Sequence, residues 1–175
     1  KSFANTKANL LISSELEKFP VKSVSNIYKV FEEYSASNGA RPSTIQKFLG
    51  IMGQETIKVF DINLRQNFYS QDMIKTSLSL ANVLKLNLNE LSTLKKLLNL
   101  NGDEKKILNE LSRIYSLFLI ALTKGKSGSI LFKEGKFSKH EGYKINVEDT
   151  VGAGDAFVAA LVTGLLRGYE LEDIH

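Results

Sequence analysis

The sequence predicts an α/β fold built on a mostly parallel sheet. Short apolar segments typical of buried strands alternate with longer segments in which apolar residues recur at helical spacing. The chain has 175 residues, of which 43% are hydrophobic and 24% charged, as in ordinary globular proteins. It contains no internal repeat and no low-complexity linker. These observations favour one compact domain over a disordered chain, a collagen or a coiled coil.

The first part of the chain, residues 1–42, is predicted to be a poorly assigned helical region. Its apolar residues recur near helical spacing, at Leu16, Phe19, Val24, Ile27, Val30, Phe31 and Tyr34. We expect one or two amphipathic helices there, followed by a short helix that Ser43 caps. The remaining residues, 43–175, form the second predicted region.

From residue 43 onward, strands and helices alternate. The predicted strands are 57–62, 81–86, 117–123, 129–133 and 143–147. The predicted helices are 72–80, 90–98, 103–117 and one over 157–165 that ends at Gly168. The last two strands are expected to be antiparallel, with a turn at 134–136. Because ligands of such sheets bind beyond the carboxyl ends of the strands, the residues that follow each strand are candidate site residues.

Composition and charge exclude several classes of protein. There is no Cys, so there is no disulfide framework and no thiolate site, which suits a reducing, cytoplasmic compartment. The longest apolar run, near 117–122, is far shorter than the roughly 20 residues of a membrane span, and residues 1–9 lack the apolar stretch of a signal peptide. The net charge of +4 is spread along the chain, which argues against nucleic acid but suits a phosphorylated ligand.

The strongest motif is the small-residue turn Asp149-Thr150-Val151-Gly152-Ala153-Gly154-Asp155-Ala156-Phe157 before the last predicted helix. Small residues let the backbone approach a ligand, and free amides at a helix start bind anions. Asp155, in the first turn, is placed to accept a proton from a hydroxyl. Together these features suit phosphoryl transfer. The alternative is a tight turn with a capping Asp.

Two further segments follow predicted strands directly. In Asp61-Ile62-Asn63-Leu64-Arg65, the guanidinium of Arg65 can hold a carboxylate or phosphate with two bonds, although a solvated turn is the alternative. In Asn87-Leu88-Asn89-Glu90, an amide oxygen and a carboxylate three residues apart can order Mg²⁺ through its waters. The alternative there is a simple helix cap.

A glycine-containing loop, Thr123-Lys124-Gly125-Lys126-Ser127-Gly128-Ser129, follows the strand predicted over 117–123. Its Gly-Lys-Ser matches the tail of a P-loop, but the position of the first P-loop glycine holds Ile120, so a P-loop is excluded. The alternative for this loop is an ordinary turn. The two histidines, His140 and His175, have no partners at ligand spacing, so no metal site is assigned to them.

These four segments, in this order, resemble the motifs of the PfkB (ribokinase-like) carbohydrate kinases, and the Asp-x-Asn-x-Arg segment resembles that of fructokinases and 2-keto-3-deoxygluconate kinases. The resemblance covers residues 43–175 and implies a three-layer ribokinase-like fold. It implies that Asp155 is the catalytic base and that the amides of Gly152, Ala153 and Gly154 form an anion hole. It further implies sugar or phosphate contacts for Asp61, Asn63 and Arg65, and nucleotide contacts for Thr123, Gly125 and Gly128. Asn87 and Glu90 would hold Mg²⁺ through water, and Asp149 and Val151 match the positions at which some members bind a monovalent cation such as K⁺.

The resemblance predicts an ATP-dependent sugar kinase that transfers the γ-phosphate to a hydroxymethyl group, with fructose or a related ketose as the substrate. Its expected partners are the sugar and ATP, and a homodimer is the assembly that the family suggests. The first strands, the sugar-contacting glycine pair and the lid of the family are not recognisable, so we expect an incomplete, C-terminal-central portion of a kinase. The alternative is a catalytically inactive, kinase-like binding or structural protein.

Overall fold

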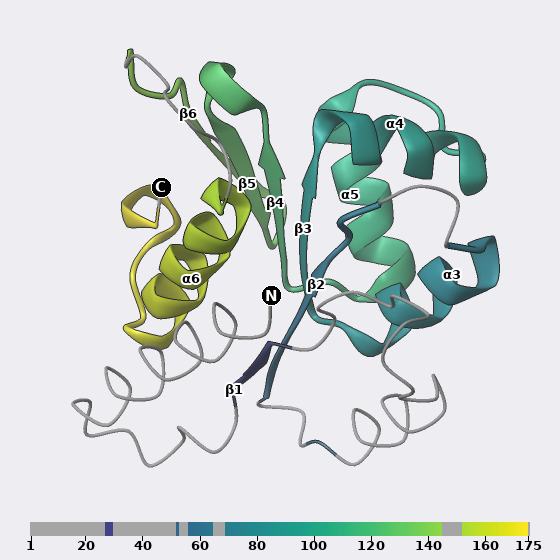
Figure 1. Cartoon of the computed structure of the whole chain (residues 1–175), viewed down its shortest axis with the longest axis horizontal. Coiled ribbons are helices and arrows are strands. Elements are labelled where there is room, and N and C mark those ends of the chain that lie inside the picture. Colours follow the sequence, from purple (N-terminus) through teal and green to yellow (C-terminus); the bar gives the residue numbers. More distant parts are fainter. Residues whose placement is uncertain (1–26, 30–51, 53–55, 65–68, 145–151, 175) are drawn as a thin grey trace.

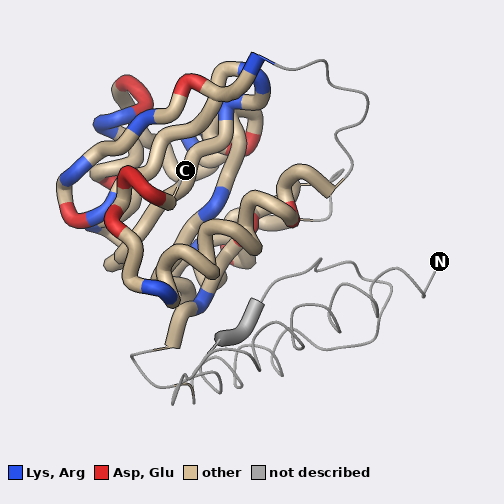
Figure 2. Tube along the Cα trace, turned by 90° about the vertical axis from the view of Figure 1, so that its left-hand side faces the viewer, with Lys and Arg blue, Asp and Glu red and all other residues tan. Residues whose placement is uncertain are grey.

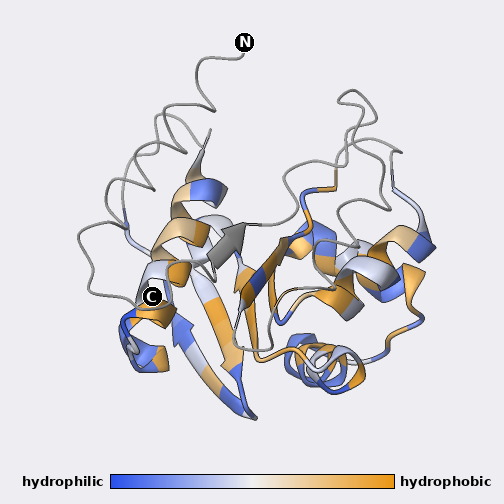
Figure 3. Ribbon diagram, turned by 90° about the horizontal axis from the view of Figure 1, so that it is seen from below, coloured by the Kyte–Doolittle hydropathy of each residue, from blue (hydrophilic) through white to orange (hydrophobic). Residues whose placement is uncertain are grey.

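The computed structural model describes residues 27–29, 52, 56–64, 69–144 and 152–174. They form three layers, in which helix α6 lies on one face of a central sheet and helices α3, α4 and α5 lie on the other (Figure 1). The view from below shows the same arrangement, with the apolar strands in the middle, between α6 and the other helices (Figure 3). The three-layer α/β fold predicted from the sequence is confirmed.

The sheet has six strands in the order β1-β2-β3-β4-β5-β6. The strands are β1 (Ile27–Lys29), β2 (Ile57–Asp61), β3 (Val83–Asn87), β4 (Leu119–Thr123), β5 (Ser129–Lys133) and β6 (Lys136–His140). The first four pair in parallel, and β5 and β6 complete the sheet in antiparallel pairing. Because four neighbouring strands are parallel, their carboxyl ends meet at one edge of the sheet, where a site is expected.

Helix α3 (Gln71–Leu80) connects β2 to β3, and helices α4 (Leu88–Leu97) and α5 (Glu104–Tyr115) connect β3 to β4. Helix α6 (Ala153–Leu166) follows β6, and short 3-10 turns are η2 (Gly125–Ser127) and η3 (Leu171–Asp173). The side chains of Ser70, Asn87 and Asp103 cap α3, α4 and α5 by accepting a bond from the amide three residues on. In the part of the chain that the structure describes, no helix combines the length and apolarity that a membrane crossing needs.

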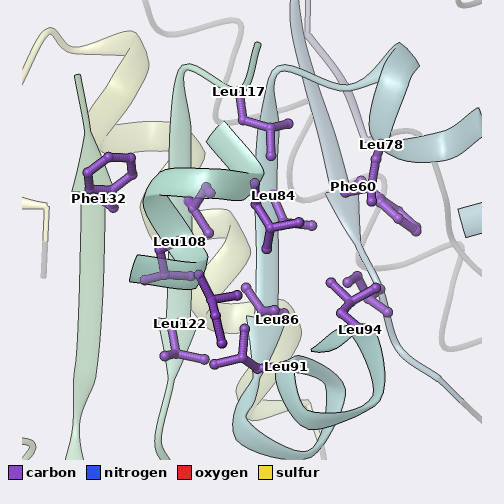
Figure 4. Close-up of a cluster of buried hydrophobic side chains, with 14 of the residues drawn as sticks. Phe60, Leu78, Leu84, Leu86, Leu91, Leu94, Leu108, Leu117, Leu122 and Phe132 are labelled. Atoms are coloured by element: carbon purple, nitrogen blue, oxygen red, sulfur yellow. The ribbon is translucent and has the colours of Figure 1, made fainter. Parts of the chain in front are cut away.

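Two apolar clusters hold the layers together. The larger joins the sheet to α3, α4 and α5, and Figure 4 shows its side chains converging between the strands and these helices. Leu108 of α5 is fully buried in this cluster, and its truncation to Ala would lower the free energy of unfolding by roughly 2–5 kcal/mol. The smaller cluster joins α6 and η3 to the other face, through residues that include Val59, Val83 and Val158.

Asn82 fixes the amino ends of three strands. Its side-chain oxygen accepts a bond from the amide of Lys58 at 2.8 Å, and its side-chain nitrogen donates to the carbonyl of Thr56 at 2.8 Å. Its own carbonyl accepts from the amides of Phe118 and Leu119. A single residue therefore aligns β2, β3 and β4, which sets the relative position of their carboxyl ends.

Two predictions about the elements are wrong. Residues 27–29, placed in a helical region, form strand β1, because parallel pairing with β2 outweighs the local apolar spacing. The second strand of the hairpin is Lys136–His140, and Tyr143 and Lys144 lie in no strand, while 145–147 are outside the described residues. Glu134 and Gly135 both have positive φ and form a two-residue turn, so Lys136 pairs at once with Lys133. The short helix expected after Ser43 lies outside the described residues.

Candidate active site

The carboxyl ends of β2, β3 and β4 place polar side chains on the face that α6 covers. Side chains of a strand alternate between the two faces, and Val59, Val83 and Ala121 belong to the cluster beneath α6. Two residues further along each strand, on the same face, stand Asp61, Lys85 and Thr123. The sheet thus changes from apolar to polar at the end where ligands of this fold class bind.

Asp61 and Lys85 form a buried ion pair. The ammonium of Lys85 lies 2.9 Å from Asp61 Oδ1 and 3.2 Å from Oδ2, and the side chains are only 8% and 14% exposed. The two residues are register partners on β2 and β3, so the pairing of the strands fixes them side by side. Since both carboxylate oxygens accept from one ammonium, each charge holds the other in place.

The amino end of α6 reaches this ion pair. Gly152 caps the helix in a left-handed conformation, with φ of 81°, which explains a glycine at that position. Asp155 stands in the first turn and is the one charged side chain of α6, which otherwise appears as a tan helix in Figure 2. A Cβ placed on Gly154 would lie 3.2 Å from Lys85 Nζ. Asp155, the predicted base, therefore directly follows the residue of α6 that lies close to Lys85 of the sheet.

Asn87 and Glu90 form a capping box at the start of α4. Asn87 Oδ1 accepts from the Glu90 amide at 3.0 Å, and Glu90 Oε2 accepts from the Asn87 amide at 2.7 Å. The capping alternative is thus realised. A carboxylate has about four acceptor sites and an amide oxygen two, so both side chains keep acceptor capacity. The described residues contain no group of three or more His, Cys, Asp or Glu side chains that could hold a metal ion. The one carboxylate of Glu90 and the one amide oxygen of Asn87 fit Mg²⁺ held largely through its own waters.

The Glu90 carboxyl is buried beside the ion pair. Burial raises the pKa of Glu90, while the backbone of Asn87, the charge of Lys85 and the backbone of Leu64 lower it. The charge of Asp61 raises the pKa of Glu90 further. Glu90, Lys85 and Asp61 therefore form one electrostatically linked cluster, which we call the strand-end cluster.

The glycine loop after β4 lies beside this cluster. Thr123 is the register partner of Asn87, and its hydroxyl donates to the carbonyl of Leu86 at 3.4 Å. Gly125 and Gly128 both have positive φ, and a Cβ at Gly128 would overlap the carbonyl oxygen of His140. Only glycine fits at Gly128, so the loop is held tightly against the β6 end of the hairpin.

The structure brings some of the predicted site residues together. Asp61, Asn87, Glu90, Thr123 and Gly154 lie at or beside adjacent strand ends. Asn63 follows β2 with a positive φ of 40° and is exposed. The predictions for Arg65, Asp149 and Val151 fall outside the described residues.

Sequence reasoning missed Lys85. Lys85 lies within the apolar stretch predicted as the strand 81–86, and it is 7% exposed. The available signal was that β3 is flanked by parallel strands and covered on both faces, which leaves a lysine no solvent. A lysine inside such a strand indicates a buried charge with a specific partner.

Comparison with known proteins gives a consistent family. The family model described as "pfkB family carbohydrate kinase" matches residues 4–175. A fructokinase of Escherichia coli is 31% identical over 111 residues, which are 61% of this chain and 35% of that protein. A sugar kinase of Pyrococcus horikoshii is 31% identical over 138 residues, covering 75% of this chain and 40% of that protein. The chain thus spans well under half the length of these relatives.

Solved structures of sugar and nucleoside kinases are similar to this chain. A structure of the sugar kinase from P. horikoshii in complex with ATP has a TM-score of 0.59 and 29% identity, and the match covers 74% of this chain and 41% of that one. A nucleoside kinase of Methanocaldococcus jannaschii, described as an archaeal member of the ribokinase family, has a TM-score of 0.61 at 24% identity. That match covers 77% of this chain and 43% of the other, and supports the ribokinase-like fold.

Proposed function

Because the chain belongs to the pfkB family of carbohydrate kinases, we propose that it carries the phosphate-handling part of an ATP-dependent kinase acting on a sugar hydroxymethyl group. The observation that carries the proposal is the position of Asp155. It stands in the first turn of α6, behind a left-handed glycine cap, and directly follows Gly154, the residue that approaches Lys85 of β3. A carboxylate there can take a proton at the point where helix amides attract an anion.

In the proposed reaction a sugar hydroxymethyl oxygen attacks the γ-phosphorus of ATP. A new oxygen–phosphorus bond forms, the bond from the γ-phosphorus to the β–γ bridging oxygen breaks, and ADP leaves. The hydroxyl proton passes to the Asp155 carboxylate. The amides of Gly152, Ala153 and Gly154 donate to the transferring phosphoryl oxygens, and the positive end of the α6 dipole supports the developing charge.

The other predicted residues fall into groups that would contact the sugar, the nucleotide and the cations. Asp61, Asn63 and Arg65 follow β2 and would serve the sugar side, while Thr123, Gly125 and Gly128 follow β4 and would serve the nucleotide. Asn87 and Glu90 would hold Mg²⁺, which when bound supplies positive charge to the phosphates of ATP. Asp149 and Val151 would bind K⁺ beside the anion hole.

We propose a ketose such as fructose as the substrate. The support is the Asp-x-Asn-x-Arg segment, together with relatives named fructokinase at about 31% identity. The relatives also include a 2-dehydro-3-deoxygalactonokinase of Haloferax volcanii, so acidic keto sugars belong in any substrate screen.

The test is a coupled assay of ADP release by the full-length protein with ATP, Mg²⁺ and about ten sugars, beside titration calorimetry with ATP. Asp155→Asn is expected to lower kcat about 10³-fold while ATP affinity stays within about threefold, since a general base contributes roughly 10²–10⁴. Wild-type turnover by Asp155→Asn would refute the assignment of the base. ATP binding by the wild type without ADP release for any sugar would instead support the inactive, kinase-like alternative.

A further inference from the structure

We propose that Lys85 is a positioning residue: its ammonium, held by Asp61, sets the position of the first turn of α6 through a close approach at Gly154. The inference rests on the proposed function, because its importance lies in where the following residue, Asp155, is placed. It gives the buried lysine of β3 a role in phosphoryl transfer without requiring that it touch the substrate.

Lys85 is rigid at both ends. Its backbone belongs to β3, paired with β2 and β4, and its carbonyl accepts a bond from the amide of Ile62 at 3.2 Å. Its ammonium is held by both oxygens of Asp61, at 2.9 and 3.2 Å, in a site almost without solvent. An ion pair of this kind is costly to break, so the ammonium is a fixed object for anything packed against it.

Gly154 is the residue of α6 that approaches the Lys85 ammonium. Its backbone is helical and its φ is not positive, so an alanine there would be free of backbone strain. Ala would even favour the helix over Gly. Apart from the neighbouring residues and backbone of α6 itself, the one atom of the described residues within 4 Å of a Cβ built at this position is Lys85 Nζ, at 3.2 Å. That separation is tight for a Cβ, so either the ammonium or the helix must give way.

The consequence concerns Asp155. Because Asp61 restrains the ammonium, an added Cβ at Gly154 is expected to displace the start of α6 rather than Lys85. Gly152, Ala153 and Asp155 would move with it, and these carry the proposed anion hole and base. The shift that relieves this contact is a few tenths of an ångström. Since a misplacement of about 1 Å in such groups lowers turnover roughly 10²-fold, we expect this smaller shift to cost a few-fold in kcat.

The test is a double-mutant cycle in the full-length protein with Gly154→Ala, Lys85→Ala and the two combined. We expect Gly154→Ala to lower kcat about three- to tenfold, with KM for ATP within about threefold. In the Lys85→Ala background, where the Cβ has room, the same Gly154→Ala change should alter kcat by less than about twofold. Such coupling indicates one shared contact. Equal fold losses in the two backgrounds would overturn the proposal.

A second readout does not depend on turnover. Hydrogen exchange of the backbone amides in residues 153–157 should be faster in Gly154→Ala than in the wild type, and this increase should shrink in the Lys85→Ala background. If the wild type phosphorylates no sugar, the proposed function fails, and the exchange cycle still decides whether Lys85 positions α6. Additive exchange effects would overturn the proposal independently of any activity.

Loss of stability is controlled separately. Leu108→Ala removes a fully buried side chain on the opposite face of the sheet and is expected to destabilise the fold without lowering kcat of the folded enzyme. A fall in kcat equal to that of Lys85→Ala would show that the lysine acts only through stability. If Lys85→Ala does not fold, Lys85→Met replaces it in the cycle, because Met keeps the volume but is not held by Asp61.

Discussion

Replacing Asn87 separates two roles of one side chain, the helix capping that the structure shows and the Mg²⁺ binding that we propose. Asn87 Oδ1 accepts from the Glu90 amide at 3.0 Å, and Asn87→Ala removes that bond. The reverse bond, from the Asn87 amide to Glu90 Oε2, involves the backbone and remains. One lost cap bond costs about 1 kcal/mol, which for a chain of this size lowers Tm by roughly 2–4 °C.

Asn87→Ser keeps a capping oxygen, so its free energy of unfolding should lie within about 0.5 kcal/mol of that of the wild type. Its shorter side chain, already engaged as the cap, cannot reach a hydrated ion as the amide does. If Asn87 also orients Mg²⁺, both variants should raise the Mg²⁺ concentration for half-maximal ADP release about tenfold or more. The assay is urea unfolding beside ADP release over a Mg²⁺ series.

Asp103→Ala is the matched control, because Asp103 caps α5 by accepting from the Lys106 amide at 2.9 Å. It should lose similar stability without changing the Mg²⁺ dependence. Unchanged Mg²⁺ dependence in both Asn87 variants would refute the metal role and leave Asn87 as a cap alone. Full stability in Asn87→Ala would refute the capping argument itself.

Two further changes test the surroundings of the site. Burial raises the pKa of Glu90, so the folded state holds the proton of this carboxyl more tightly than the unfolded chain does. The protonated carboxyl therefore stabilises the fold below about pH 4.5, and this stabilisation is lost as the pH rises through the pKa of the folded state. Glu90→Gln should therefore gain unfolding free energy relative to wild type between pH 4 and 7, measured by urea titration at each pH; a constant difference would contradict the burial argument. Gly128→Ala should raise KM for ATP at least about tenfold, because its Cβ would overlap the His140 carbonyl and displace the loop. The matched control is Gly135→Ala, at a positive φ with nothing within 4 Å, which should affect stability alone; an unchanged KM in Gly128→Ala would count against the nucleotide role of the loop.

Most of the fold could be predicted because its elements carry their own signals. Strand β5 matches its predicted range, and β2, β3, β4 and the helices α3 to α6 are each found near theirs, since buried strands and amphipathic helices differ in period. Strand β1 could not be predicted from its three residues, because a piece that short has no period of its own. Its conformation follows from pairing with β2, which is a tertiary effect. Strand β6 could not be predicted because its residues are mostly polar, and it begins directly after the two-residue turn at Glu134 and Gly135.

The site divides in the same way. Its backbone parts were visible in the sequence, because glycines and caps at strand ends are local signals, and Asn87, Gly128 and Gly152 stand where such signals predict. The Asp61–Lys85 pair was not visible as a pair. The two residues are 24 positions apart, and only the parallel register of β2 and β3 brings them together.

The burial of Lys85 and Asp61 calls for an explanation other than stability. Taking two charges out of water costs several kcal/mol for each ion, and replacing such a pair with apolar residues of similar volume is often neutral or stabilising by roughly 1–4 kcal/mol. The neighbouring positions on this face, Val59 and Val83, already show that apolar side chains pack beneath α6. What apolar residues could not provide is a fixed, directional contact beside Gly154. A pair retained for geometry should lose turnover when made apolar even as the fold gains stability. Asp61→Leu combined with Lys85→Met is therefore expected to unfold at equal or higher urea concentration with kcat lowered at least about tenfold, whereas loss of the proposed sugar contact of Asp61 would raise KM for the sugar. Full turnover in that stable double variant would show that the pair serves the fold alone.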